Sequence, residues 1–113
     1  MASTLTITQA RVADGVTITL VGEIDLARSP ELRLRLREEV DGGPRRLVID
    51  LARVTYMDSS GVATLVEALQ RSKARGCRLI LSGLQPKVRS IFAISRLDTV
   101  FEIKATLDEA TTA

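Results

Sequence analysis

The stretch RLVIDLARVTYMDSSGVATLVEAL, Arg46 to Leu69, leads from an apolar segment through a polar turn into a second apolar segment. Its first six residues, Arg46 to Leu51, are short, apolar and β-branched, which is typical of a buried parallel strand. In its last part, the i, i+3, i+4 and i+7 positions of one helix face are apolar. These positions are Val62, Leu65, Val66 and Leu69. The stretch therefore predicts a strand followed by a helix that covers the sheet.

The composition is that of a globular protein, and we predict a single domain spanning residues 1–113. Hydrophobic residues make up 45% and charged residues 27%, with a formal net charge of +2. Only 3% of residues are aromatic and the charges nearly balance. The composition therefore does not indicate nucleic-acid binding, which usually requires a basic surface with interleaved aromatic side chains. The N-terminus does not resemble a secretory signal, and no apolar run approaches the ~20 residues of a membrane span. We expect a cytoplasmic protein without direct membrane insertion.

The N-terminal segments predict a β-hairpin. Thr4 to Thr8 and Val16 to Val21 alternate apolar and hydroxyl residues, and the turn signal ADG lies between them at Ala13 to Gly15. The next segment, Glu31 to Val40, is ambiguous because its leucines and arginines alternate with the period of a strand. We predict a helix there because Leu32, Leu36 and Val40 share a helical stripe. Upstream, Ser29 suits the N-cap and Pro30 the first turn.

The C-terminal third predicts two further strands and two helices. Arg78 to Leu81 is a buried strand, Pro86 opens a helix, and Val100 to Ile103 is a short edge strand. Thr106 and Glu109 fit a capping box for a last helix. The order β-β-α-β-α-β-α-β-α predicts a mixed α/β fold. Its four- to five-stranded sheet has an antiparallel N-terminal hairpin and later parallel strands, flanked by about four helices.

The turn DSSG is the candidate site, because sites in such sheets tend to form beyond the carboxyl ends of parallel strands. Asp58, Ser59 and Ser60 suggest nucleophilic chemistry, but a serine is a poor nucleophile without a base, and the chain contains no histidine. We therefore expect no catalytic residues and no enzyme. No zinc-type ligand set and no glycine-rich phosphate loop is present, so we expect neither metal nor cofactor.

Two interpretations of DSSG stay open on the residues alone. Asp and Ser are preferred N-caps, but a cap explains only one of the three polar residues. Alternatively, a serine is a substrate that another protein phosphorylates, since a helix N-terminus tolerates the added charge. Such a modification changes the surface that a partner meets.

The chain resembles the STAS domain family, and in particular the bacterial anti-sigma factor antagonists. The resemblance rests on LVGEIDLARSPELR (Leu20 to Arg33), LVIDLARVTYMDSSG (Leu47 to Gly61) and LILSGLQPKVRSIFAISRLDTVFEI (Leu79 to Ile103). These segments follow one another in the family's order and cover nearly the whole chain. The D-S-S-G element is the specific part of the match.

The resemblance implies a phosphorylation switch. By position, Ser59 is the implied acceptor, with Ser60 as second choice, an anti-sigma factor serine kinase is the implied partner, and a PP2C-type phosphatase removes the phosphate. The unphosphorylated protein then binds the kinase and frees a sigma factor. We expect the protein to be a monomer or weak dimer. The expected partner-binding residues are Glu23, Asp25, Asp58, Ser59, Ser60, Gly61, Val62 and Thr64.

Two other functions stay open. Some STAS domains are accessory subunits of lipid-transport ABC complexes or belong to signalling assemblies without a sigma factor, although many accessory versions replace the acceptor serine. A serine-dependent hydrolase is the third alternative, and it predicts turnover of an ester without any partner protein.

Overall fold

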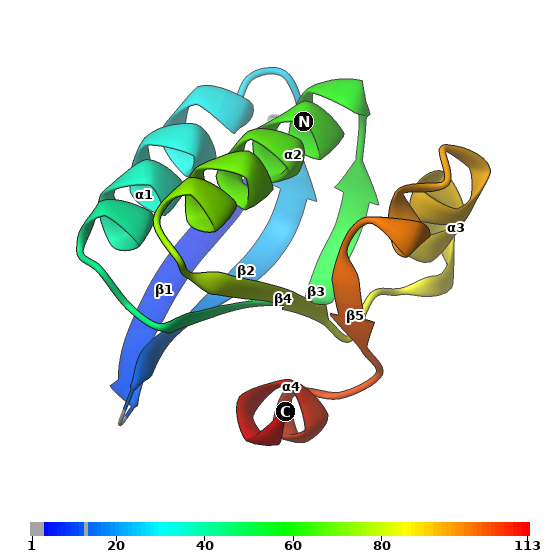
Figure 1. The fold of residues 1–113 in the computed structure, drawn as a ribbon. Coiled ribbons are helices and arrows are strands. Elements are labelled where there is room, and N and C mark those ends of the chain that lie inside the picture. The colour runs from blue at the N-terminus through cyan, green and yellow to red at the C-terminus, as the bar shows by residue number, and fades with distance from the viewer. Residues whose placement is uncertain (1–3, 13) are drawn as a thin grey trace.

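Five strands form one mixed sheet in the order β1-β2-β3-β4-β5 (Figure 1). The structure is a computed structural model that describes residues 4–12 and 14–113. The strands are β1 Leu5–Val12, β2 Gly15–Ile24, β3 Arg46–Met57, β4 Arg78–Ser82 and β5 Glu102–Lys104. The helices are α1 Ser29–Asp41, α2 Ser59–Ala74, α3 Pro86–Ile94 and α4 Leu107–Thr112, with a 3-10 turn at Leu97–Thr99. The mixed α/β class and the order of elements predicted from the sequence are confirmed.

The first two strands form the predicted antiparallel hairpin. Pairing runs from Leu5 opposite Gly22 to Val12 opposite Gly15, so β1 is longer than the predicted strand. The predicted turn includes Ala13, which lies outside the described residues. From β2 onward all neighbouring strands are parallel, as expected from the helical connections between them.

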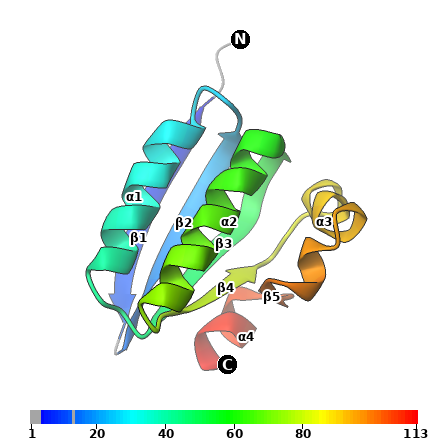
Figure 2. The same ribbon diagram turned by 45° about the horizontal axis from the view of Figure 1, so that its top comes forward.

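Helices cover both faces of the sheet unequally. Helices α1 and α2 lie side by side over one face, and α3 contributes to the same core, whereas α4 lies on the opposite face (Figure 2). The main core contains fully buried aliphatic side chains from β2, β3, α1 and α2, such as Leu20, Ile49, Leu36 and Leu65. A smaller cluster of Val48, Ile80 and Ala110 lies beneath α4.

Helix α1 resolves the ambiguity of the Leu–Arg alternation. Leu32, Leu36 and Val40 are buried, while Leu34 is 56% exposed, as a helix requires and a strand does not. The arginines on the α2 side have a partner there: Arg33 Nε and Arg37 Nη2 lie 2.9 and 2.8 Å from the carboxylate of Glu67. These ion pairs are solvent-exposed and therefore contribute little to the free energy of folding.

Two predicted strands have different bounds in the structure. Strand β3 does not end at Leu51 but continues to Met57, because it keeps pairing with β2 to that residue. Beyond Asp50 it no longer pairs with β4, and its polar residues there face solvent. The predicted strand Val100 to Ile103 is displaced, since β5 begins at Glu102 after the 3-10 turn. Phe101 instead enters the core, where its ring packs edge-on against Phe92 at 5.4 Å between centroids.

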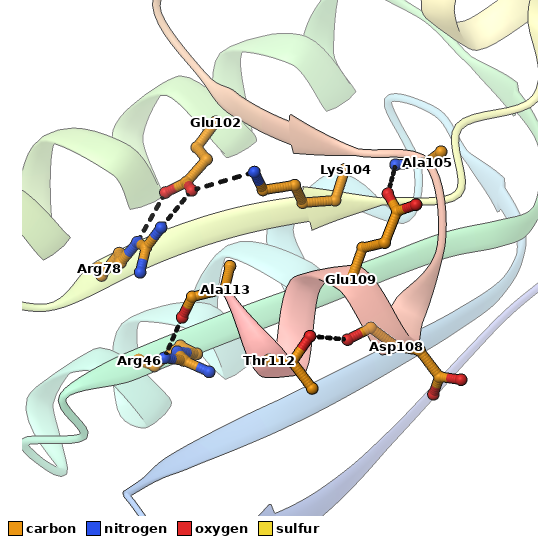
Figure 3. Close-up of polar contacts among 9 residues, drawn as sticks. All are labelled: Arg46, Arg78, Glu102, Lys104, Ala105, Asp108, Glu109, Thr112 and Ala113. Atoms are coloured by element: carbon orange, nitrogen blue, oxygen red, sulfur yellow. Dashed lines mark hydrogen bonds and ion pairs between the residues drawn. The ribbon is translucent and has the colours of Figure 1, made fainter.

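The short helix α4 is held by polar contacts at both ends (Figure 3). At its start, the predicted capping residues act together: Glu109 N donates to Thr106 Oγ1, and Glu109 Oε2 accepts from Ala105 N. At its end, the Arg46 guanidinium donates to the carbonyl oxygens of Thr111 and Ala113. These contacts help a helix of six residues to stay on the sheet.

The start of α2 packs closely against the end of β2. A Cβ atom at Gly61 would lie 2.8 Å from Ile24 Cγ2 and from Met57 Cγ, and 2.9 Å from the Ile24 carbonyl oxygen. The lack of a side chain at this position therefore has a packing role. It allows α2 to begin directly above the ends of β2 and β3.

We predict that Gly61→Ala lowers the free energy of unfolding by about 1–2 kcal/mol, because overpacking outweighs the higher helix propensity of alanine. Urea denaturation of the purified protein measures this change. Gly42→Ala is the matched control, since Gly42 has φ −69° and its Cβ would meet no atom closer than 3.3 Å. That variant should stay within about 0.5 kcal/mol of the wild type. Equal stabilities for the two variants would contradict the packing argument.

Candidate functional site

The site is built where two strand-to-helix junctions meet at one edge of the sheet. Strands β2 and β3 are parallel neighbours, and their last paired residues are Ile24 and Met57. The β2–α1 junction begins after Ile24, and the β3–α2 junction is Asp58 alone. Asp58 N donates to the Ile24 carbonyl oxygen at 3.2 Å, which joins the two junctions through the backbone.

The Asp58 carboxylate binds both junctions. One oxygen, Oδ1, caps α2 by accepting from Ser60 N at 2.9 Å and Gly61 N at 3.2 Å, and it also accepts from Ser60 Oγ. The other, Oδ2, accepts from Leu26 N at 3.2 Å. The hydrogen bond from the Ser60 hydroxyl, with those from backbone N–H groups, lowers the pKa of Asp58 below its ordinary value. Asp58 is therefore a structural anion that holds the two loops in place.

Three serine hydroxyls lie near Asp58, and two of them are already used. Ser60 Oγ donates to Asp58 and lies 2.9 Å from Ser29 Oγ, which in turn donates to the Asp25 carbonyl oxygen at 2.8 Å. Ser59 is the first residue of α2 and is exposed, and its hydroxyl has no hydrogen-bond partner within residues 4–12 and 14–113. Ser59 is thus the hydroxyl that an approaching molecule can reach.

The predicted docking residues divide into exposed, half-buried and buried ones. Glu23 and Asp25 are half-buried at the carboxyl end of β2, on the same edge as Asp58, and Val62 is half-buried in the first turn of α2. Thr64 was expected on this surface, but it is 1% exposed and its hydroxyl donates to the Ser60 carbonyl oxygen. It therefore stabilises the turn from beneath instead of contributing to the docking surface.

Two further corrections concern the same loops. Gly61 is buried against Ile24 and so supports the surface without forming part of it. Ser29 is not the N-cap of α1: that residue is Arg28, and Ser29 is already in the first turn with its side chain 3% exposed. The Ser29 hydroxyl meets Ser60 of α2, so it links the two helices.

Sequence reasoning missed Leu26. Its side chain is 75% exposed, although its backbone N–H is fixed by Asp58. The signal was present as the one large apolar residue of the junction DLAR, Asp25 to Arg28. This exposed apolar side chain, on a backbone held by Asp58, gives the edge an apolar contact point among its acids.

The chemistry of the site is that of a recognition surface. Asp58 has a lowered pKa and accepts several hydrogen bonds, so it is a weak base for a neighbouring serine. In the described part of the chain, no group of three or more His, Cys, Asp or Glu residues could hold a metal ion. No helix among the same residues is long and apolar enough to cross a membrane.

Similarity to known proteins covers nearly the whole chain. An anti-sigma-B factor antagonist of Listeria monocytogenes is 34% identical over 96 residues, which is 83% of this chain and 82% of that protein. An anti-sigma factor antagonist of Mycobacterium paratuberculosis has a crystal structure that superposes with a TM-score of 0.89 at 26% identity, covering 96% of this chain and 92% of the other.

A third similar structure is the Bacillus cell fate determinant SpoIIAA in its phosphorylated form. Its TM-score is 0.74 at 27% identity, and the match covers 95% of this chain and 97% of that one. The family model of the STAS domain matches residues 7–110, which include every element from β1 to α4 except the ends of the first and last. The chain therefore belongs to the STAS domain family.

Proposed function

We propose that this protein is an anti-sigma factor antagonist whose binding is switched by phosphorylation of Ser59. The proposal rests on a difference among the three serine hydroxyls of the site in hydrogen bonding and exposure. Those of Ser29 and Ser60 are used within the fold, while that of Ser59 is exposed at the start of α2. The relatives named as anti-sigma factor antagonists support the same function.

Ser59 is an acceptor and not a nucleophile that the protein activates itself. The chain has no histidine, and Asp58 is committed to capping α2 and to Leu26. The kinase partner brings its own base and ATP. The Ser59 oxygen attacks the γ-phosphorus, the bond to ADP breaks, and the hydroxyl proton passes to the kinase.

The phosphorylated protein is expected to keep its fold. Ser59 is at the N1 position of α2, where the helix dipole and free N–H groups favour negative charge. A phosphate adds about −1.5 to −2 charges there without displacing a buried group. The similar SpoIIAA structure in the phosphorylated form supports this expectation.

The switch then acts on the docking surface. This surface consists of the half-buried acids Glu23, Asp25 and Asp58, with Ser59 and Leu26 exposed beside them and Val62 at the margin. When Ser59 is unmodified, Leu26 and the hydroxyl can be covered by the partner. A phosphate among these acids must be desolvated at the interface, which costs several kcal/mol unless a cation pairs with it.

The proposed partner is a serine-kinase anti-sigma factor, which the unphosphorylated protein sequesters so that a sigma factor is released. A PP2C-type phosphatase restores binding by removing the phosphate. We place these reactions in the cytoplasm, where sigma factors act. The protein itself performs no catalysis in this scheme.

We predict that the cognate anti-sigma factor kinase with ATP adds one phosphate to the wild type and to Ser60→Ala, and none to Ser59→Ala. Intact-protein mass spectrometry measures the added mass. Ser60→Ala is the matched control because it removes the neighbouring hydroxyl while the backbone cap of α2 remains. Phosphate on Ser60 in the wild type would contradict the assignment of Ser59. Ester turnover without a partner, lost in Ser59→Ala, would instead indicate a hydrolase.

We also predict that Ser59→Asp weakens binding to the unliganded kinase partner at least tenfold, which corresponds to about 1.4 kcal/mol. Calorimetric titration measures the affinity. Ser59→Asn is the control of equal size without charge and should bind much more tightly than the aspartate variant. The melting temperature of Ser59→Asp should equal or slightly exceed that of the wild type, because the added charge lies at a helix N-terminus. Wild-type affinity in Ser59→Asp would count against a switch based on charge.

A further inference from the structure

Strand β1 is an edge strand whose outer side is unpaired. Among the described residues it is the first strand of the sheet and pairs only with β2. It lies at the margin of the sheet in Figure 1 and Figure 2. Glu23 N donates to the Thr4 carbonyl oxygen, so the hydrogen-bonded pairs with β2 involve Thr4 and every second residue after it. The backbone groups of the alternate residues therefore point away from the sheet. These are Leu5, Ile7, Gln9 and Arg11.

The outer edge of β1 carries almost none of the features that normally prevent strand addition. It has eight residues, of which Thr6, Ile7, Thr8 and Val12 are β-branched, with no proline and no charge before Arg11. The register shifts of the sheet lie between β2 and β3, so β1 pairs regularly along its length. The opposite edge contrasts with it, since β5 has only three residues, two of which, Glu102 and Lys104, are charged.

We propose that β1 pairs with β1 of a second copy of this chain. An antiparallel arrangement about a twofold axis at Thr8 uses all the outward-pointing backbone groups in the described part of β1. Leu5 then pairs with Arg11 of the other copy, and Ile7 with Gln9, each in a hydrogen-bonded pair. The two Thr8 residues face each other in the intervening non-hydrogen-bonded position. The result is one continuous sheet through both copies.

Charges on α1 are complementary in this arrangement. Arg35 lies on the β1 side of α1, because its Nη2 donates to Gln9 Oε1 at 3.1 Å. Glu31 and Glu38 precede and follow it by four and three residues and so share that side, where both are exposed. The twofold axis sets the two α1 helices antiparallel on the same face of the sheet. Each arginine then has carboxylates of the other copy as neighbours, which favours a second copy over an unrelated strand.

The pairing leaves the phosphorylation site free. Ser59 lies beyond the end of β3, on the far side of β2 from the paired edge. Because the two β1 strands are antiparallel, the two docking surfaces lie at opposite ends of the paired sheet. This interface is independent of the proposed switch, and its test requires no kinase.

A cysteine scan tests the register. At a non-hydrogen-bonded pair the Cα atoms are about 4.5 Å apart, within the range that a disulfide spans. Thr8→Cys should therefore form a disulfide dimer under mild oxidation. Thr6→Cys is the matched control on the same face, because the two Thr6 residues would be about 13 Å apart. Cross-linking should be on the order of tenfold faster at position 8 than at position 6. The native Cys77 is buried, and burial raises its pKa, so the wild type should not cross-link.

Charge substitution tests the same axis in the untagged protein by sedimentation velocity over a series of concentrations. The wild type should show reversible dimerisation. Thr8→Lys and Thr8→Glu should each be monomeric with unchanged circular dichroism, since Thr8 is exposed and like charges would face each other. An equimolar mixture of the two should dimerise again. A wild type that stays monomeric over the concentration series, equal cross-linking at positions 6 and 8, or a mixture that stays monomeric would each overturn the proposal.

Discussion

The carboxylate of Asp58 is the interaction on which the site depends. It caps α2 through Ser60 and Gly61 and holds the β2–α1 junction through Leu26 N, so one anion fixes two loops that come from different strands. The close approach of Gly61 to Ile24 brings these partners within reach. Because the carboxylate accepts hydrogen bonds within the fold, it is a weak base for the adjacent Ser59 hydroxyl, which agrees with the proposal that another protein modifies that hydroxyl.

Much of the fold could be predicted from the sequence, because most elements bury a local apolar pattern. Helix α1 is an example, because its sequence also alternates like a strand. The helical spacing of Leu32, Leu36 and Val40 nevertheless predicted the correct element, and all three residues are buried. The bounds of β3 were harder to predict because they depend on which neighbours the strand has along its length. Its last residues pair with β2 alone, and no local pattern encodes that partner.

The candidate site could be located from DSSG, but the residues alone, without the family resemblance, did not assign the role of each hydroxyl within it. Ser29 and Ser60 are 31 residues apart in the sequence, and their hydroxyls meet only because β2 and β3 are adjacent and in register. The role of Thr64 could not be predicted either, because a threonine in the first turns of a helix can face solvent or donate to a carbonyl oxygen of the preceding turn. In the structure its hydroxyl donates to the Ser60 carbonyl oxygen. Which hydroxyl remains exposed is thus a tertiary property, and it singles out Ser59.

A rigid scaffold suits a switch that works by surface charge. The hydrogen bonds around Asp58 hold the backbone of the Ser59 turn before any modification, so a phosphate does not have to move the chain to be recognised. In the proposed switch, a partner meets the same shape with a different charge, and the difference in affinity comes from the desolvation of that charge. The scaffold also separates its surfaces: Ser59 follows β3 in the middle of the sheet, whereas the unpaired backbone groups lie on β1. The proposed self-association at β1 and the proposed partner binding at Ser59 therefore use separate surfaces of the same molecule.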